Sequence, residues 1–257
     1  MQKSRRQRRV IIVIQSILLV GLLSFYLLLL FPTMARNPAS TDLGKFYASA
    51  QLLWQKQDIY MPISVEALGP LPPSSLSARN SDTLHPNLNL PTVTILLAPL
   101  ALLSFSSTFW LWSVLSLLAG FIACFLVWQT ASPRPRKGLS GLMWIWIIYL
   151  AYFPTFAALQ LGQLTFFLLL LMAFVWRQTR IANSLWLAGI LLGLAISLKI
   201  FIGLLVLFYL IRRQWQVAAG AVATFSIGIL LGLLVVGIRG FESYFATMQT
   251  ITWFGSN

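Results

Sequence analysis

Long apolar runs occupy most of this chain, and several of the short gaps between them carry basic residues but no acidic ones. Hydrophobic residues make up 58% of the sequence and charged residues 9%, which excludes a water-soluble enzyme and favours a polytopic helical membrane protein. Lys and Arg in short loops mark the cytoplasmic side of such a protein. We therefore expect the N-terminus and the basic gaps to be cytoplasmic. These regions contain 12 of the 18 basic residues: Lys3, Arg5, Arg6, Arg8, Arg9, Arg134, Arg136, Lys137, Arg177, Arg180, Arg212 and Arg213.

The acidic residues lie in other parts of the chain, in the segment after the first apolar run and near the C-terminus. They are Asp42, Asp58, Glu66, Asp82 and Glu242. Their stretches also hold five of the remaining six basic residues, the sixth being Lys199, so the charge there is nearly balanced. By the same rule these stretches face away from the cytoplasm. We expect any chemistry that needs a carboxylate to take place on the outer face of the plasma (inner) membrane.

The spacing of the apolar runs predicts an all-α, multi-pass protein with about seven transmembrane helices in a single membrane domain, 1–257. An outer loop, 32–107, is expected to contain juxtamembrane helices. One is an amphipathic helix beginning at residues 40–42 that lies on the outer membrane face. Another is a short apolar segment, 92–103, that dips into the membrane or lies flat on it without crossing. Residues 184–211 are expected to form two short helices that turn near Lys199. The expected spans are 11–31, 108–129, 139–158, 163–176, 184–198, 199–211 and 216–237.

Several functional classes lack support in the sequence. The basic residues are scattered through short loops, so no contiguous basic face is available for nucleic acid. One Cys and one His make a zinc or haem site improbable, and we expect no metal and no cofactor. No Gly-rich phosphate loop or dinucleotide fingerprint occurs. An enzyme that faces outward has no access to cytoplasmic nucleotide sugars. If the chain uses an activated sugar donor, that donor would most simply arrive in the membrane as a lipid phosphate.

Two ionisable residues are the main candidates for chemistry. Asp42 is placed to accept a proton from a hydroxyl nucleophile at the outer surface, although it could equally serve as the N-cap of the following helix. Lys199 interrupts two apolar runs, where a charge costs about 2.5 to 3.5 kcal/mol at the bilayer centre. A lipid phosphate would offset that cost, and so would extension of the side chain to the membrane interface.

Weaker candidates come from polar residues at the outer ends of the apolar runs. Gln163 follows Gly162 between two spans and could bind a sugar, or it could belong to an ordinary polar turn. His85 precedes the short apolar segment, where a lone His is more often structural than catalytic. A purely structural role therefore stays open for both Gln163 and His85.

The order of these features resembles the family 87 glycosyltransferases, membrane enzymes of the GT-C fold that use polyprenyl-phosphate sugars, often mannose. The resemblance rests on TDLGKFYASAQLLWQKQDIY, HPNLNLPTVTILLAPLALL, LQLGQLTFFLLLL and GILLGLAISLKIFIGLLVLFYLIRRQW, in that order. The chain is shorter than typical members, so we expect a C-terminally truncated or compact relative. It also has Ile200 where the family usually has Pro, and His85-Pro86-Asn87 where the family has an aromatic-Pro-Pro pattern.

The resemblance implies roles for particular residues. Asp42 matches the family's catalytic Asp, Tyr60 the Tyr that ends the outer helix, Gln163 the Gly-Gln step, and Lys199 the Lys after a small-residue helix. We expect Asp42 to act as the base and Lys199 to bind the donor phosphate. Tyr60, His85 and Gln163 would then orient the sugar or the acceptor.

The leading hypothesis is an inverting transferase that moves a hexose, expected to be mannose, from a polyprenyl-phosphate donor to a lipid-linked or glycan acceptor. The rival is a non-enzymatic membrane protein, namely a transporter, lipid flippase or assembly subunit. Transporters usually place ionisable residues within several spans near the midplane, whereas here only Lys199 is a candidate. That difference favours the enzyme.

Overall fold

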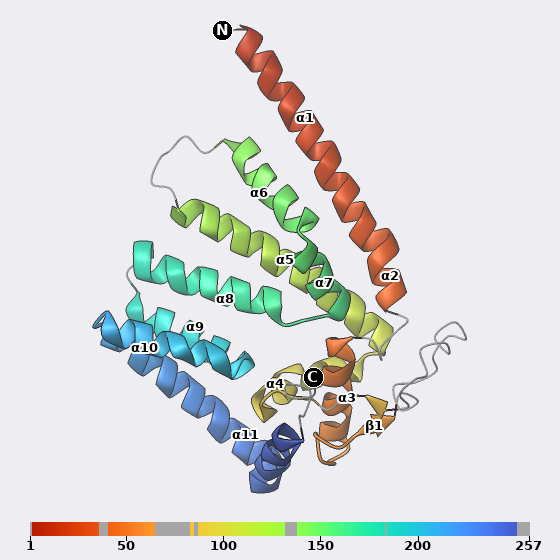
Figure 1. Ribbon diagram of the computed structural model, residues 1–257, viewed down its shortest axis with the longest axis vertical. Coiled ribbons are helices and arrows are strands. Elements are labelled where there is room, and N and C mark those ends of the chain that lie inside the picture. Colours follow the sequence, from red (N-terminus) through yellow and green to blue (C-terminus); the bar gives the residue numbers. More distant parts are fainter. Residues whose placement is uncertain are drawn as a thin grey trace, which may run out of the picture.

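The computed structural model describes residues 2–35, 41–64, 83–84, 87–131, 138–182 and 184–250 (Figure 1). Within these residues the protein is helical apart from a pair of two-residue antiparallel strands, with Ile63 opposite Leu84. The elements are α1 (Gln2–Phe25), η1 (Tyr26–Leu30), α2 (Phe31–Met34), α3 (Asp42–Trp54), β1 (Ile63–Ser64), β2 (Thr83–Leu84), α4 (Pro91–Leu97), η5 (Ala98–Leu102), α5 (Phe105–Ala131), α6 (Leu139–Ala151), α7 (Phe153–Leu161), α8 (Thr165–Arg177), η6 (Gln178–Ala182), α9 (Leu185–Leu198), η7 (Ile200–Gly203), α10 (Leu204–Ile211) and α11 (Trp215–Gln249).

Three of the described helical segments are long and apolar enough to cross a membrane: Arg9–Met34, Phe105–Ala131 and Trp215–Gln249. The pair α6 and α7 is a fourth candidate, bent by 60° at Tyr152, two residues before Pro154. Pro has no backbone N–H, so the helical hydrogen bonds cannot continue unbroken through this point. These helices confirm an all-α polytopic membrane protein. The predicted number of seven spans also counts α8, α9 and α10, which are shorter.

The helices run between two sides of the molecule. In Figure 1 the N-terminus and the start of α6 lie at the top, and the turn from α10 to α11 lies at the left edge. The outer segment with α3, α4 and β1 lies in the lower part, toward the right, and the end of α11 lies at the bottom. The side with the basic helix ends is therefore opposite the side with α3, as the charge pattern predicts. The assignment of these sides to cytoplasm and exterior stays a prediction.

Two breaks in the later helices match the sequence analysis. Lys199 has an extended backbone (φ −147°, ψ 106°) between α9 and η7, which confirms two short helices turning at this residue. The long helix α11 breaks at Gly237, where φ is 70° and ψ is −177°. This conformation is essentially restricted to glycine, so the predicted end of the last span at residue 237 coincides with a real break.

Small residues bring α9 and α11 into close contact. A Cβ added to Gly189 would lie 2.7 Å from the Val217 carbonyl oxygen, and one added to Gly193 would lie 2.6 Å from that of Ala221. Such small-residue interfaces are typical of membrane helices, because packing rather than the hydrophobic effect drives their association. This interface fixes the end of α9, and with it Lys199.

The outer helix α3 differs from the prediction. The sequence pattern predicts an apolar stripe of Leu43, Tyr47, Ala50 and Trp54. The first three are buried and Trp54 is exposed, and the other faces of the helix are also largely buried, at Phe46 and Ser49 among others. The helix packs against η5, α4 and α5, so other parts of the protein cover most of its surface. The Tyr47 hydroxyl donates to the Leu103 carbonyl at 2.7 Å, and the Trp54 indole Nε1 to the Ala98 carbonyl at 2.7 Å. Tertiary contacts with a segment about 50 residues later in the chain explain why an amphipathic pattern alone misplaced this helix.

Candidate functional site

Asp42 is the first residue of α3, but it does not cap that helix. The cap is Thr41, whose Oγ1 accepts a hydrogen bond from the Gly44 backbone N–H at 2.9 Å. The Asp42 carboxylate instead accepts a hydrogen bond from the Lys45 ammonium, at 2.9 Å from Nζ to Oδ1. Capping as the sole role of Asp42 is therefore wrong. The carboxylate lies in the first turn, where the helix dipole stabilises negative charge.

Lys199 comes close to Asp42 although the two residues are far apart in the sequence. Burial lowers the pKa of the half-buried Lys199 ammonium, the Asp42 carboxylate acts in the opposite direction and favours the charged form, and Lys45 lowers the pKa further. Nearby contacts secure the position: the Thr92 hydroxyl donates to the Ser197 carbonyl at 3.4 Å, which links the start of α4 to the end of α9. Asp42, Lys45 and Lys199 thus form a polar cluster within electrostatic range of one another, and among the described residues only Asp42 and Lys45 are paired at contact distance.

Gln163 borders the same cluster through its neighbour Gly162. Gly162 ends α7 in the left-handed conformation (φ 64°, ψ 39°), and the Gln163 backbone N–H donates to the Ala158 carbonyl at 3.0 Å. A Cβ on Gly162 would lie 2.7 Å from Cβ of Leu43, the residue after Asp42. The Gln163 Oε1 accepts from the Thr165 hydroxyl at 3.2 Å. The turn after α7 therefore lies directly against the start of α3.

Tyr60 is placed differently. Its side chain is 4% exposed, its hydroxyl donates to the Asn89 carbonyl at 2.7 Å, and its ring packs against Tyr244. Burial raises the pKa of this hydroxyl, and the nearby Tyr244 and Asp58 raise it further. The preceding residue is tied to Ser49, about 10 Å along α3 from Asp42. The arrangement gives Tyr60 a structural role in holding the outer segment together, and the structure shows no contact between it and Asp42.

His85 lies outside the described residues. The neighbouring Asn87 and Asn89 are described and buried: the Asn87 amide donates to the Thr94 hydroxyl at 3.1 Å and accepts from the Asn89 side chain at 2.8 Å. These bonds fix the chain just before α4. Their side chains are used internally, so they do not add ligand-binding groups to the cluster.

Lys45 is the residue that the sequence reasoning missed. The sequence analysis gave it no functional role, whereas the structure pairs it with Asp42. The i, i+3 spacing of opposite charges on a helix was the available signal. In the part of the chain that the structure describes, no group of three or more His, Cys, Asp or Glu side chains is arranged to hold a metal ion. The cluster can therefore offer one proton acceptor and two cations to a substrate.

Comparison with known proteins gives one match. The family model for glycosyltransferase family 87 matches residues 88–257. Gln163 and Lys199 lie within the matched region, and Asp42 and Tyr60 precede it. No match was found among curated proteins or solved structures.

Proposed function

The chain belongs to glycosyltransferase family 87, and from this we propose that it transfers a hexose from a polyprenyl-phosphate donor to a hydroxyl acceptor on the outer membrane face. The observation that carries the proposal is that Asp42 and Lys199, from distant parts of the chain, lie within electrostatic range of each other. A reaction of this kind needs a base for the acceptor and a cation for the leaving phosphate, and the two residues supply one of each.

The proposed reaction is a single inverting displacement. The acceptor oxygen attacks the anomeric carbon as the bond from that carbon to the phosphate oxygen breaks, and the acceptor proton passes to the Asp42 carboxylate. The lipid phosphate begins as a diester with one negative charge and leaves as a monoester, so negative charge grows on it during the step. Lys199 would stabilise the transition state more than the ground state, because the extra charge develops there.

The ion pair between Asp42 and Lys45 fits this scheme. The two side chains are 32% and 27% exposed, respectively, and such a pair contributes only about 0 to 1 kcal/mol. A substrate can therefore separate the two groups at little cost. Once released, Lys45 would be a second cation beside the donor phosphate. Gln163 would complete the site by hydrogen bonding to a sugar hydroxyl.

The substrate assignments extend the resemblance described above. Mannose is the expected sugar, and the acceptor is expected to be a lipid-linked or free glycan. The plasma membrane, with the active site facing outward, is the expected location, since all five acids lie in stretches that the basic gaps predict to be external.

The test is transfer by the purified protein. We would incubate it with labelled polyprenyl-phosphate mannose, and separately with the glucose analogue, together with extracted membrane lipids, and would analyse the labelled products. Asp42→Asn keeps the shape of the side chain but removes its basicity, so we expect transfer to fall about 10²- to 10⁴-fold at unchanged expression. Glu242→Gln, which neutralises another exposed outer carboxylate, is the control and should retain activity. Turnover by Asp42→Asn close to that of the unmodified protein would exclude Asp42 as the base.

A further inference from the structure

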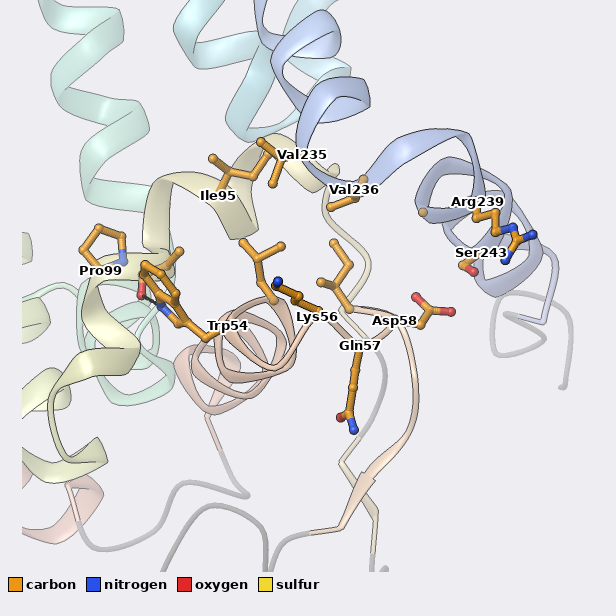
Figure 2. A pocket seen from close by; sticks show the side chains of 14 residues that line it. Trp54, Lys56, Gln57, Asp58, Ile95, Pro99, Val235, Val236, Arg239 and Ser243 are labelled. Carbon is orange, nitrogen blue, oxygen red and sulfur yellow. Dashed lines mark hydrogen bonds between the residues drawn. The ribbon is translucent and has the colours of Figure 1, made fainter.

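A large cavity lies near the opposite end of α3 from Asp42. It has a volume of about 1010 Å³ and opens between the end of α3, the α4–η5 segment and the part of α11 around its break (Figure 2). Thirteen helical residues separate the ends of α3 by about 18 Å, so this cavity is distinct from the Asp42 cluster. Its volume is at the upper end of the range for pockets that hold small molecules.

The walls of the cavity are mainly apolar. Figure 2 shows Ile95, Pro99, Val235 and Val236 around it, with Trp54 at one side. The Trp54 indole is held by its hydrogen bond to the Ala98 carbonyl, and the side chain is 57% exposed. A fixed, exposed Trp is typical of the headgroup level of a membrane. The apolar walls therefore lie where a lipid chain would meet them.

The break in α11 also indicates that this cavity lies near the headgroup level of the membrane. Residues before Gly237 belong to a helix that is long enough to cross the membrane, and the chain changes direction at that residue. The following turns are held to the outer segment, since the Tyr244 ring packs against Tyr60 at 5.5 Å between centroids. Arg239 thus lies just after the break at which α11 changes direction.

Charged groups occur at the rim, and among the described residues no carboxylate forms an ion pair with the cations there. Lys56, Asp58 and Arg239 all line the cavity and are exposed. Within the described residues the one ion pair is that of Asp42 with Lys45, so neither Lys56 nor Arg239 is neutralised by a carboxylate at contact distance. Asp58 accepts a hydrogen bond from the Tyr60 backbone N–H at 3.0 Å, which leaves a second carboxylate oxygen facing the rim. The site offers two cations and one acceptor above an apolar wall.

We propose that this cavity binds an anionic phospholipid whose headgroup carries hydroxyl groups. Lys56 binds the phosphate, Asp58 accepts a hydrogen bond from a headgroup hydroxyl, Arg239 beyond Asp58 adds positive potential, and the acyl chains pack on Ile95, Val235 and Val236. The charges and the apolar wall match the two parts of such a lipid. This site is separate from the proposed transfer reaction, and its occupancy can be measured without any sugar donor.

The probe is phosphatidylglycerol, compared with the zwitterionic phosphatidylcholine. Native mass spectrometry of the detergent-solubilised full chain would measure the affinity for each lipid. We expect phosphatidylglycerol to bind more tightly, and the double variant Lys56→Gln with Arg239→Gln to lose about 10- to 30-fold in that affinity. Arg212→Gln with Arg213→Gln is the matched control at the other end of the molecule and should leave this binding unchanged. Equal affinity for the two lipids, or equal losses in both double variants, would overturn the proposal.

A second variant tests the apolar wall without changing charge. Val235→Trp fills the cavity from α11, where Val235 is 51% exposed and tolerates a larger side chain. We expect it to reduce phosphatidylglycerol binding at least tenfold at an unchanged melting temperature, and unaltered binding would contradict the site.

A competition experiment distinguishes a phospholipid from a prenyl lipid as the occupant of the cavity. Displacement of phosphatidylglycerol by an equimolar polyprenyl phosphate would assign the cavity to the prenyl lipid and refute the phospholipid assignment.

Discussion

The contact between Gly162 and Leu43 allows a sharp prediction about how the outer site is positioned. Gly162 ends α7 with φ 64°, and a Cβ there would lie 2.7 Å from Cβ of Leu43. We expect Gly162→Ala to destabilise the protein and, in addition, to impair transfer. The reason is that Leu43 directly follows Asp42 at the start of α3.

The magnitude follows from two costs. A left-handed backbone costs a residue with a Cβ about 1 to 2 kcal/mol, and overpacking adds about 1 to 3 kcal/mol. The sum is about 2 to 5 kcal/mol. The clash involves Cβ of Leu43, so rotation of its side chain cannot relieve it and the backbone must move. Carbon atoms pack best at about 3.5 to 4.0 Å, so the shift required is about 1 Å. A misplacement of that size can reduce turnover by about 10²-fold.

The assay measures melting temperature in detergent and transfer per folded molecule for the same preparation. Gly21→Ala is the control, because a Cβ on Gly21 meets nothing within 4 Å and the residue lies inside the last two turns of α1. It should be neutral or slightly stabilising. A Gly162→Ala protein that melts like the unmodified chain would refute the packing argument. One that is destabilised but transfers normally would show that this contact does not position Asp42.

Two other predictions concern topology and Tyr60. In a background with Cys124 replaced by Ala, a cysteine at Gln57 should react with impermeant reagents from outside the cell, and a cysteine at Gln216 should not. The reverse labelling pattern would place α3 in the cytoplasm and refute the outward-facing site. Tyr60→Phe removes the hydrogen bond to the Asn89 carbonyl, so we expect about 1 kcal/mol of lost stability with little change in transfer. A loss of transfer beyond tenfold at normal stability would show that this hydroxyl contacts substrate.

Much of the fold could be predicted because the membrane restricts the choices. Apolar length and loop charge predicted the helices, the turn at Lys199 and the end of the last span near Gly237. The position of α3 was not predictable from its own pattern. Its polar and apolar residues suit a surface helix, and only the contacts with η5, α4 and α5 bury it.

The candidate site was predicted in part. Sequence reasoning selected Asp42 and Lys199 as residues that needed a functional explanation, and the structure brings their charges together. It did not predict that Thr41 takes over the cap or that Lys45 pairs with Asp42, since several residues near a helix start have suitable chemistry and only coordinates decide among them. Tyr60 was selected from the resemblance alone, and the structure uses its hydroxyl to hold the backbone at Asn89.

The central claim is that Lys199 acts on the phosphate of a lipid-linked donor beside Asp42. The most direct test is the dependence of transfer rate on donor concentration for the unmodified protein, Lys199→Met and Lys199→Arg. We predict that Lys199→Met folds normally but loses about 10² in kcat/KM for the donor, with an unchanged KM for the acceptor. Lys199→Arg should keep part of the activity, because it retains the charge with a different geometry. Unchanged donor kinetics in Lys199→Met would contradict the claim and leave Lys199 as a lysine that only extends to the membrane interface.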